Sequence, residues 1–164
     1  MKIYIFRHAQ KAVDFSGDPD LTLEGHSQAV KLMEKVLKNE LPTPTQLWVS
    51  PRKRTHSTFR PLAEQLKLPL QEQEALQEQT SDETIVDFRK RVKNLLTGAS
   101  TLTQDVVFMC SHYDWVVEAL AVIPSDTDFS SDYEYAHWSP CQHMGFEVSE
   151  DGFFKFIELK RINL

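Results

Sequence analysis

Two histidines and two arginines stand where the chain is expected to leave the strands of a sheet. Arg7 and His8 follow one β-rich segment, Arg54 comes shortly after a second, and His112 follows the most apolar segment of the chain. Guanidinium groups match the oxygens of a phosphoryl group, and a neutral imidazole can attack phosphorus and hold the group covalently. If these side chains lie together, they predict a site that handles phosphate.

The segments that must position these side chains have the composition of strands. Lys2–Phe6 alternates and is rich in β-formers, Gln46–Val49 is a short candidate strand, and Asp105–Ser111 is apolar enough for a central place in a sheet. In open α/β sheets, ligands bind beyond the carboxyl ends of the strands. We therefore expect the residues that follow these segments to converge.

The segment after the second strand predicts a helix that contributes to the same edge. Ser50 is expected to cap this helix with Pro51 at its first position, and the helix should run to Leu66 with a bend or interruption at Pro61. Its start would add backbone donors to an anion site.

The remaining patterns alternate between helix and strand. Apolar spacing predicts a helix over Leu23–Asn39 with Thr22 as its N-cap, and Ser81–Thr84 is typical of the start of another helix. Further predicted elements are a short strand at Leu70–Gln73, a helix from Asp114 to about Ala121, and a final hairpin of Met144–Ser149 and Phe153–Leu159. Pro124–Pro140 receives no assignment. The alternation indicates an α/β fold with a mixed sheet.

Length and composition narrow the class of protein. The 164 residues suffice for one domain, 1–164, and the net charge of −6 argues against a nucleic-acid partner. The longest apolar runs are strand-sized and the N-terminus does not resemble a signal peptide, so we expect a cytoplasmic protein without a membrane partner. Cys110 and Cys141 show no zinc-binding spacing, and Cys110 is expected in a buried strand.

Four short motifs then resemble one family, the histidine phosphatase superfamily, which includes phosphoglycerate mutases and bacterial phosphohistidine phosphatases. Arg7-His8-Ala9 is similar to its Arg-His-Gly signature, and residues 21–26 are similar to its Leu-Thr-x-x-Gly helix start. Residues 50–58 resemble its Ser-Pro-x-x-Arg-x-x-x-Thr segment, and residues 109–112 resemble the strand before its second histidine. Each motif is weak alone, but the four occur in family order from residue 2 to about 120.

The resemblance implies a fold and a set of roles. The fold would be a three-layer α/β/α, phosphoglycerate mutase-like domain with a mixed, mostly parallel sheet. His8 would be the nucleophile, while Arg7, Arg54 and His112 would bind the phosphoryl oxygens without metal or cofactor. The proton donor would be Glu78, in Leu76-Gln77-Glu78, although a surface role is an equally weighted alternative for it. Glu74 and Glu83 lie nearby in the sequence and remain alternatives.

The function implied is hydrolysis of a phosphorylated small molecule or a phosphoprotein. The chain is short, as in bacterial phosphohistidine phosphatases, so a protein-bound phosphohistidine is one expected substrate; the sequence specifies no oligomeric state. The alternative is a phosphate- or phosphoprotein-binding module of the same fold without turnover. The sequence departs from the family pattern at three positions: Ala9 in place of glycine, Tyr113 after the second histidine, and Asp14 where many members carry asparagine. Tyr113 and Asp14 are the departures that favour this alternative.

Other candidate motifs lack the neighbouring residues that their function would require. Asp18-Pro19-Asp20-Leu21-Thr22 resembles the motif of aspartate-nucleophile phosphatases, but no apolar strand precedes it, and we set it aside. Four further histidines do not pair at metal-ligand spacing and are interpreted as surface or loop residues: His26, His56, His137 and His143. For His137 and His143, a contact at the rim of the site remains a weaker expectation.

Overall fold

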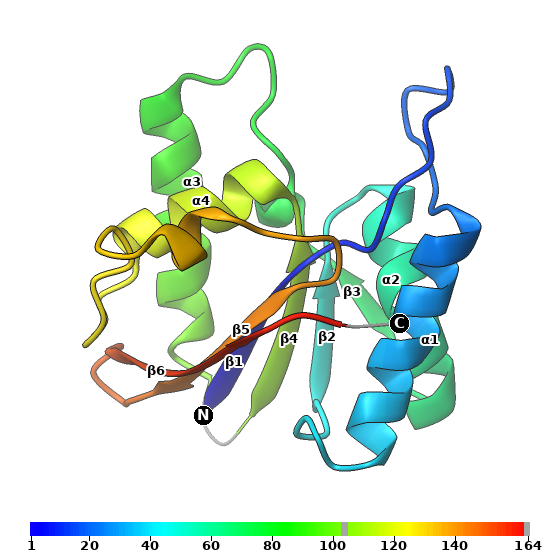
Figure 1. Ribbon diagram of the computed structural model, residues 1–164. Coiled ribbons are helices and arrows are strands. Elements are labelled where there is room, and N and C mark those ends of the chain that lie inside the picture. The colour runs from blue at the N-terminus through cyan, green and yellow to red at the C-terminus, as the bar shows by residue number, and fades with distance from the viewer. Residues whose placement is uncertain (103–104, 163–164) are drawn as a thin grey trace.

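The fold is organised around one six-stranded sheet. The computed structural model describes residues 1–102 and 105–162. The strand order is β3-β2-β4-β1-β5-β6, and Figure 1 shows the strands running through the middle of the molecule. The strands are β1 (Lys2–Arg7), β2 (Gln46–Val49), β3 (Leu70–Glu72), β4 (Val106–Ser111), β5 (His143–Val148) and β6 (Phe154–Lys160).

The sheet is mixed and mostly parallel. β1 pairs with β4, and β2 pairs with β3 and β4, all in the parallel sense, whereas β5 is antiparallel to both β1 and β6. β4 lies between β1 and β2, which confirms the central position expected from its apolar sequence. The final hairpin is also confirmed, and it extends the sheet beyond β1.

Two pairs of helices cover the two faces of the sheet (Figure 1). On one face α1 packs against α2, and on the other α3 packs against α4. This is the three-layer α/β/α arrangement that the sequence predicts. The helices are α1 (Leu23–Leu37), α2 (Lys53–Leu66), α3 (Ile85–Ala99) and α4 (Tyr113–Val122), with short 3-10 turns η1 (Glu74–Leu76) and η2 (Tyr133–Ala136).

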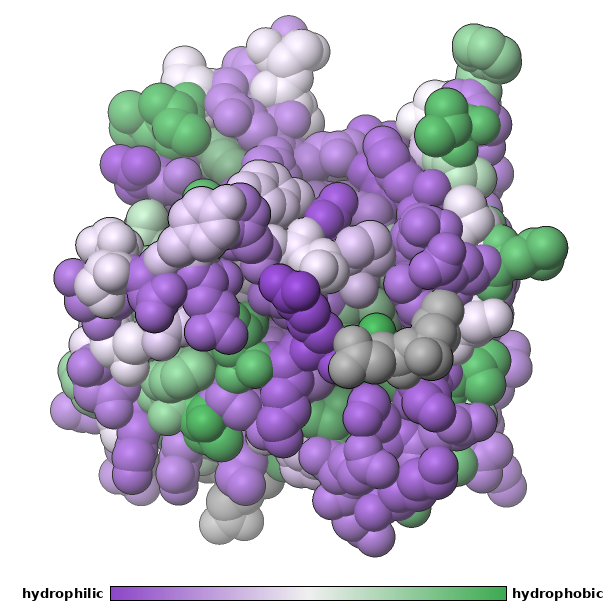
Figure 2. Space-filling model, in the orientation of Figure 1, coloured by the Kyte–Doolittle hydropathy of each residue, from purple (hydrophilic) through white to green (hydrophobic). Residues whose placement is uncertain are grey.

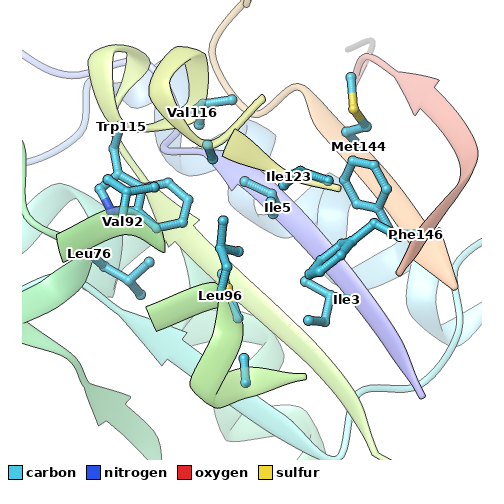
Figure 3. Packing of buried hydrophobic residues seen from close by; sticks show 14 of the residues in the cluster. Ile3, Ile5, Leu76, Val92, Leu96, Trp115, Val116, Ile123, Met144 and Phe146 are labelled. Carbon is cyan, nitrogen blue, oxygen red and sulfur yellow. The ribbon is translucent and has the colours of Figure 1, made fainter. Parts of the chain in front are cut away.

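Successive side chains of each strand point to opposite faces of the sheet, and this alternation produces the two cores between the sheet and the helices. In β1, Ile3 and Ile5 join the core beneath α3 and α4, whereas Tyr4 and Phe6 join the core beneath α1 and α2. Figure 3 shows the first core, in which Trp115 and Val116 of α4 lie above Ile5. Because both sides of β1 are buried, its carboxyl end, where Arg7 stands, is held firmly.

Caps and turn residues explain several element boundaries. Thr22 caps α1 as predicted, its Oγ1 accepting from the Gly25 amide at 3.0 Å, and Thr84 caps α3 in the same way through Asp87. Gly152 in the β5–β6 turn has φ 81°, a backbone conformation that favours glycine.

The predicted start of α2 is wrong. The helix begins at Lys53, and Arg52, rather than Ser50, occupies the N-cap position without a side-chain cap. Ser50 Oγ instead contacts Thr55 Oγ1 at 3.0 Å and the His112 ring at 2.8 Å, so the hydroxyl serves a tertiary network. Pro61 does not interrupt the helix, which reaches Leu66 as expected.

The interpretation of His143 as a surface or loop residue is also wrong. Its side chain lies on β5, 1% exposed, against the rings of Tyr4 and Phe6. Its Nε2 lies 3.3 Å from Glu158 Oε1 on the neighbouring strand β6. A histidine can be buried in a sheet when a cross-strand carboxylate satisfies it, and nothing in the local sequence reveals that partner.

The surface above the carboxyl ends of the strands carries two projections (Figure 1). One is the segment 10–20 and the other is the segment 77–84. Val13 and Phe15, on the first projection, are almost fully exposed, and Figure 2 shows hydrophobic side chains at the tip of this projection, whereas the tip of the second carries none. Within the described residues, no helix is both long and apolar enough to cross a membrane.

Candidate active site

Three strand ends meet in register between the two projections. Arg7, the last residue of β1, is opposite Ser111 in β4, and Val49 of β2 is opposite Cys110. The backbone amide of His8 donates to the Ser111 carbonyl at 2.9 Å, which continues the pairing one residue past the strand. The residues that follow the three strands are therefore brought to one edge, as the sequence predicts.

The backbone around His8 is fixed from several directions. The His8 carbonyl accepts from the Cys141 amide at 3.1 Å. The next amide, that of Ala9, donates to Thr58 Oγ1 at 2.9 Å, and the same hydroxyl donates to the Arg54 carbonyl at 2.6 Å. Thr58 thus joins the loop that carries His8 to the helix that carries Arg54.

One tautomer of His8 follows from its contacts. Its Nδ1 lies 2.7 Å from the Ala9 carbonyl oxygen, which can only accept, so Nδ1 carries the proton and Nε2 keeps its lone pair. Burial lowers the pKa of His8 from 6.5 to about 3. The hydrogen bond to Ala9 acts to raise this pKa, whereas the positive charges of Arg54 and Arg7 lower it further. The ring is therefore a neutral imidazole at physiological pH, the form that can act as a nucleophile.

His112 stands beside His8 in a similar state. The two ring centroids are 5.4 Å apart, with the planes inclined at 62°. Arg54 Nη2 donates to His112 Nδ1 at 3.1 Å, so Nε2 carries the proton and donates to Ser50 Oγ at 2.8 Å. Burial, followed by the charge of Arg54, lowers the pKa of His112 to about 2.

The arginines supply positive charge to this edge. Arg54 is 5% exposed and reaches the site from the first turn of α2. Arg7 donates to the Trp138 carbonyl, and its guanidinium carbon lies 5.6 Å from the centre of the Tyr113 ring. Within the described part of the chain, the buried Nε atoms of Arg7, Arg52 and Arg54 have no hydrogen-bond partner. These donors are the kind of group that a tetrahedral anion satisfies.

Glu78 contacts the cluster of histidines and arginines from the second projection, the segment 77–84. Its Oε2 accepts from Arg54 Nη2 at 2.7 Å and lies 3.7 Å from His112 Nδ1, while its Oε1 lies 3.1 Å from Arg52 Nη2. Of the two alternatives, Glu83 is paired with Arg91 and Glu74 is exposed on η1. Among the three glutamates, Glu78 is the one whose carboxylate contacts this cluster.

Tyr113 and Asp14, two of the departures from the family pattern, have partners of their own. Tyr113 donates its hydroxyl to the Ala136 carbonyl at 2.9 Å, so its ring is fixed beside Arg7 at the rim. Asp14 Oδ1 accepts from the Ser16 amide at 2.9 Å on the exposed projection, where hydrogen bonds to Ser16 lower the pKa of Asp14. Its carboxylate is therefore turned toward its own loop.

Sequence reasoning missed three residues of this cluster. Asp18, which was set aside with a misleading motif, lies 3.9 Å from Arg54 Nη1 and accepts from the Lys53 amide at 3.2 Å. It thereby occupies the start of α2 that was expected to offer donors to a ligand. Arg52 was seen only as part of a motif, and Ser50 was predicted as a helix cap and not as a partner of His112. The side-chain contacts of all three are made across the fold, so no local pattern indicates them.

Within residues 1–102 and 105–162, no three or more His, Cys, Asp or Glu side chains are grouped so as to hold a metal ion.

Comparison with known proteins bears on the family and on the fold. Residues 3–82 match the family model described as histidine phosphatase superfamily (branch 1), which confirms the resemblance seen in the motifs. That range includes Arg7, His8, Arg54 and Glu78. No curated protein matches the chain.

Solved structures share the fold along nearly the whole chain. The protein histidine phosphatase SixA complexed with tungstate has a TM-score of 0.75 at 20% identity, covering 97% of this chain and 96% of the other. A phosphoserine phosphatase from Entamoeba histolytica, solved with phosphoserine, has a TM-score of 0.73 at 13% identity, with coverages of 96% and 95%. A mycobacterial glucosyl-3-phosphoglycerate phosphatase gives 0.70 at 15% identity, with coverages of 96% and 96%. At these identities the likeness establishes a shared fold, the phosphoglycerate mutase-like arrangement that was predicted.

Proposed function

We propose that this chain, a protein of the histidine phosphatase superfamily, is a metal-independent phosphatase that forms a covalent phosphohistidine on His8. The observation that carries the proposal is the state of that ring: a buried, neutral imidazole whose Nδ1 is bound to the Ala9 carbonyl and whose Nε2 therefore keeps its lone pair. Arg7 and Arg54 beside it supply hydrogen-bond donors to phosphoryl oxygens, and His112 would join them when its Nδ1 is released from Arg54 and takes a proton.

The proposed first step transfers the phosphoryl group to the protein. His8 Nε2 attacks phosphorus, the nitrogen–phosphorus bond forms, and the bond from phosphorus to the leaving oxygen breaks. The guanidinium groups stabilise the charge on the equatorial oxygens during transfer. The electron pair of the broken bond stays on the leaving oxygen, which takes a proton from Glu78 and departs as an alcohol.

The second step releases phosphate. A water molecule attacks phosphorus from the side vacated by the leaving group, its proton passes to Glu78, and the nitrogen–phosphorus bond breaks. The electron pair of that bond returns to His8 Nε2. The sum of the two steps is a phosphoester and water giving an alcohol and inorganic phosphate.

Glu78 can act as proton donor only after its contacts change. In the free protein its carboxylate is bound to Arg52 and Arg54. An incoming phosphoryl group would take Arg54 and bring negative charge beside the carboxylate, which favours a proton on it. A phosphoester with an alkoxide leaving group needs this proton most, whereas a phosphohistidine substrate has a better leaving group and needs it less.

The substrate class proposed is a phosphorylated small molecule or a phosphoprotein, including phosphohistidine. The printed names of proteins with the same fold span these possibilities, from phosphoserine to histidine-phosphorylated protein. Glu78→Gln separates them. A large loss of kcat toward an alkyl phosphate with little loss toward a phosphohistidine protein would indicate that both classes are turned over and that only the first requires the acid.

The experiment that tests the activity compares the wild type with His8→Ala on para-nitrophenyl phosphate and a broader panel of phosphates, with vanadate as inhibitor. We expect turnover in the wild type and a loss of about 10³-fold or more in the variant, because a nucleophile is removed. If the wild type shows no turnover above the variant on any substrate, the protein is instead a phosphate-binding module of this fold.

A further inference from the structure

Arg52 reaches the candidate active site without a role in the mechanism above. Its Nη2 lies 3.1 Å from Glu78 Oε1, while Arg54 Nη2 lies 2.7 Å from Glu78 Oε2. One carboxylate therefore bridges two guanidinium groups, and each guanidinium binds a different oxygen. Because the Arg52 side chain is only 31% exposed, this contact is partly sheltered from water.

The backbone of Arg52 is fixed by the same turn that presents Arg54. The Arg52 amide lies 3.3 Å from Ser50 Oγ, and its carbonyl accepts from Thr55 Oγ1 at 2.8 Å. Because Arg52 has an extended backbone as the N-cap residue and Arg54 lies in the first helical turn, the two side chains approach Glu78 from one rigid segment.

The position of Glu78 is equally well determined. Arg91 of α3 donates to the carbonyl of Gln77 at 2.8 Å and to that of Glu78 at 3.3 Å, and it forms an ion pair with Glu83 at 2.7 Å. These bonds hold the segment 77–83 against α3. The carboxylate of Glu78 therefore meets both arginines from a fixed backbone.

The arrangement creates a conflict when a phosphoryl group binds. Arg54 Nη2 already donates to Glu78 and to His112, so a phosphoryl oxygen that takes this donor must displace one of the two acceptors, and the carboxylate is the one whose negative charge an anion repels. Without another partner, Glu78 would face a dianion at close range in a partly desolvated site, and like charges there disfavour binding. Arg52 can keep hold of Oε1 while Oε2 is released.

We propose that Arg52 is a positioning residue that retains Glu78 when a phosphoryl group displaces this carboxylate from Arg54. By doing so, Arg52 lowers the electrostatic cost of anion binding and keeps the carboxyl group at the edge of the site, beside the position of the leaving atom. This role rests on the proposed function for its use in turnover. The binding of an anion to the site, however, does not require turnover.

The test is a double-mutant cycle on anion binding, measured by calorimetry with inorganic phosphate and with vanadate. Arg52→Gln should weaken binding about tenfold, because Glu78 loses its second partner, and Glu78→Gln should strengthen binding several-fold. In the double variant the carboxylate that needs Arg52 is gone. The affinity of the double variant for each anion should therefore lie within about threefold of that of Glu78→Gln alone.

Two further variants distinguish the proposed role of Arg52 from a general effect of positive charge near the site. Arg52→Lys keeps the charge and should recover part of the affinity lost in Arg52→Gln. Lys53→Gln removes the same charge from the neighbouring exposed residue and should stay within about twofold of the wild type, since solvent screens it. Thermal unfolding of each variant confirms that the fold is intact.

Additive effects would overturn the proposal. If Arg52→Gln weakens anion binding by the same factor in the wild type and in Glu78→Gln, Arg52 acts on the anion itself and not through Glu78. An Arg52→Gln variant that binds both anions as the wild type does would overturn it equally. The cycle can give either result even if no phosphate ester is hydrolysed, so its outcome is separate from that of the activity test.

Discussion

The neutral state of His8 and His112 makes the stability of the protein depend on pH, with a magnitude that follows from the structure. Burial lowers the pKa of His8 to about 3 and that of His112 to about 2, against about 6.5 when the chain is unfolded. Above pH 6.5 both imidazoles are neutral in the folded and in the unfolded chain, so they do not make the free energy of unfolding depend on pH. Below pH 6.5 the unfolded chain gains protons that the folded chain cannot take, and the free energy of unfolding falls.

The loss amounts to about 1.4 kcal/mol per pH unit for each histidine. Between pH 6.5 and about pH 5, each should therefore reduce the free energy of unfolding by about 2 kcal/mol, or about 4 kcal/mol for the pair. The buried His143, whose pKa is also lowered by burial, acts in the same direction. Comparing the wild type with variants of His8 and of His112 separates the contributions of these two residues from that of His143.

The assay is urea unfolding, followed by tryptophan fluorescence, at about pH 7 and about pH 5 for the wild type, His8→Gln and His112→Gln. Each variant should lose about 2 kcal/mol less than the wild type between the two pH values, whatever its stability at neutral pH. His26→Gln is the matched control, because this imidazole lies on the exposed face of α1, and it should keep the wild-type dependence. Equal losses in all four proteins would refute the reasoning, since they would mean that the folded state protonates these rings freely.

Three further substitutions test other parts of the site. Thr58→Val should destabilise the protein by about 1–3 kcal/mol and lower kcat, because the buried amide of Ala9 loses its acceptor; urea unfolding and steady-state kinetics measure both. Asp14→Asn should change kcat/KM by no more than about twofold on an aryl phosphate, since its charge is exposed and directed at its own loop. Gly25→Ala should lower the free energy of unfolding by about 1–3 kcal/mol, because a Cβ there would clash with the backbone oxygen of Gln10; wild-type stability would contradict the close approach.

Much of the fold could be predicted because its signals are local. The alternation in β1, the apolar run of β4 and the cap at Thr22 each arise from neighbouring residues, and each element forms where these patterns indicate. The convergence of Arg7, His8 and His112 follows from one general property of parallel sheets, namely that carboxyl ends share an edge.

The parts that could not be predicted depend on partners far away in the sequence. Ser50 has the local signature of a cap, yet its hydroxyl is used by His112, which lies on another strand end. Asp18 and Arg52 gain their places in the site through contacts such as those with Arg54 and Glu78, and a buried His143 is tolerated because Glu158 on the neighbouring strand contacts its ring. Such contacts override local propensity without leaving a trace in spacing or composition.

The most direct measurement is to trap the phosphorylated protein. The wild type is mixed with a rapidly cleaved phosphate ester, quenched within the first turnover, digested under alkaline conditions and mapped by mass spectrometry. The account predicts acid-labile phosphate on His8 in the wild type, and none in His8→Ala. Phosphate on any other residue, or full turnover with His8 never modified, would contradict it.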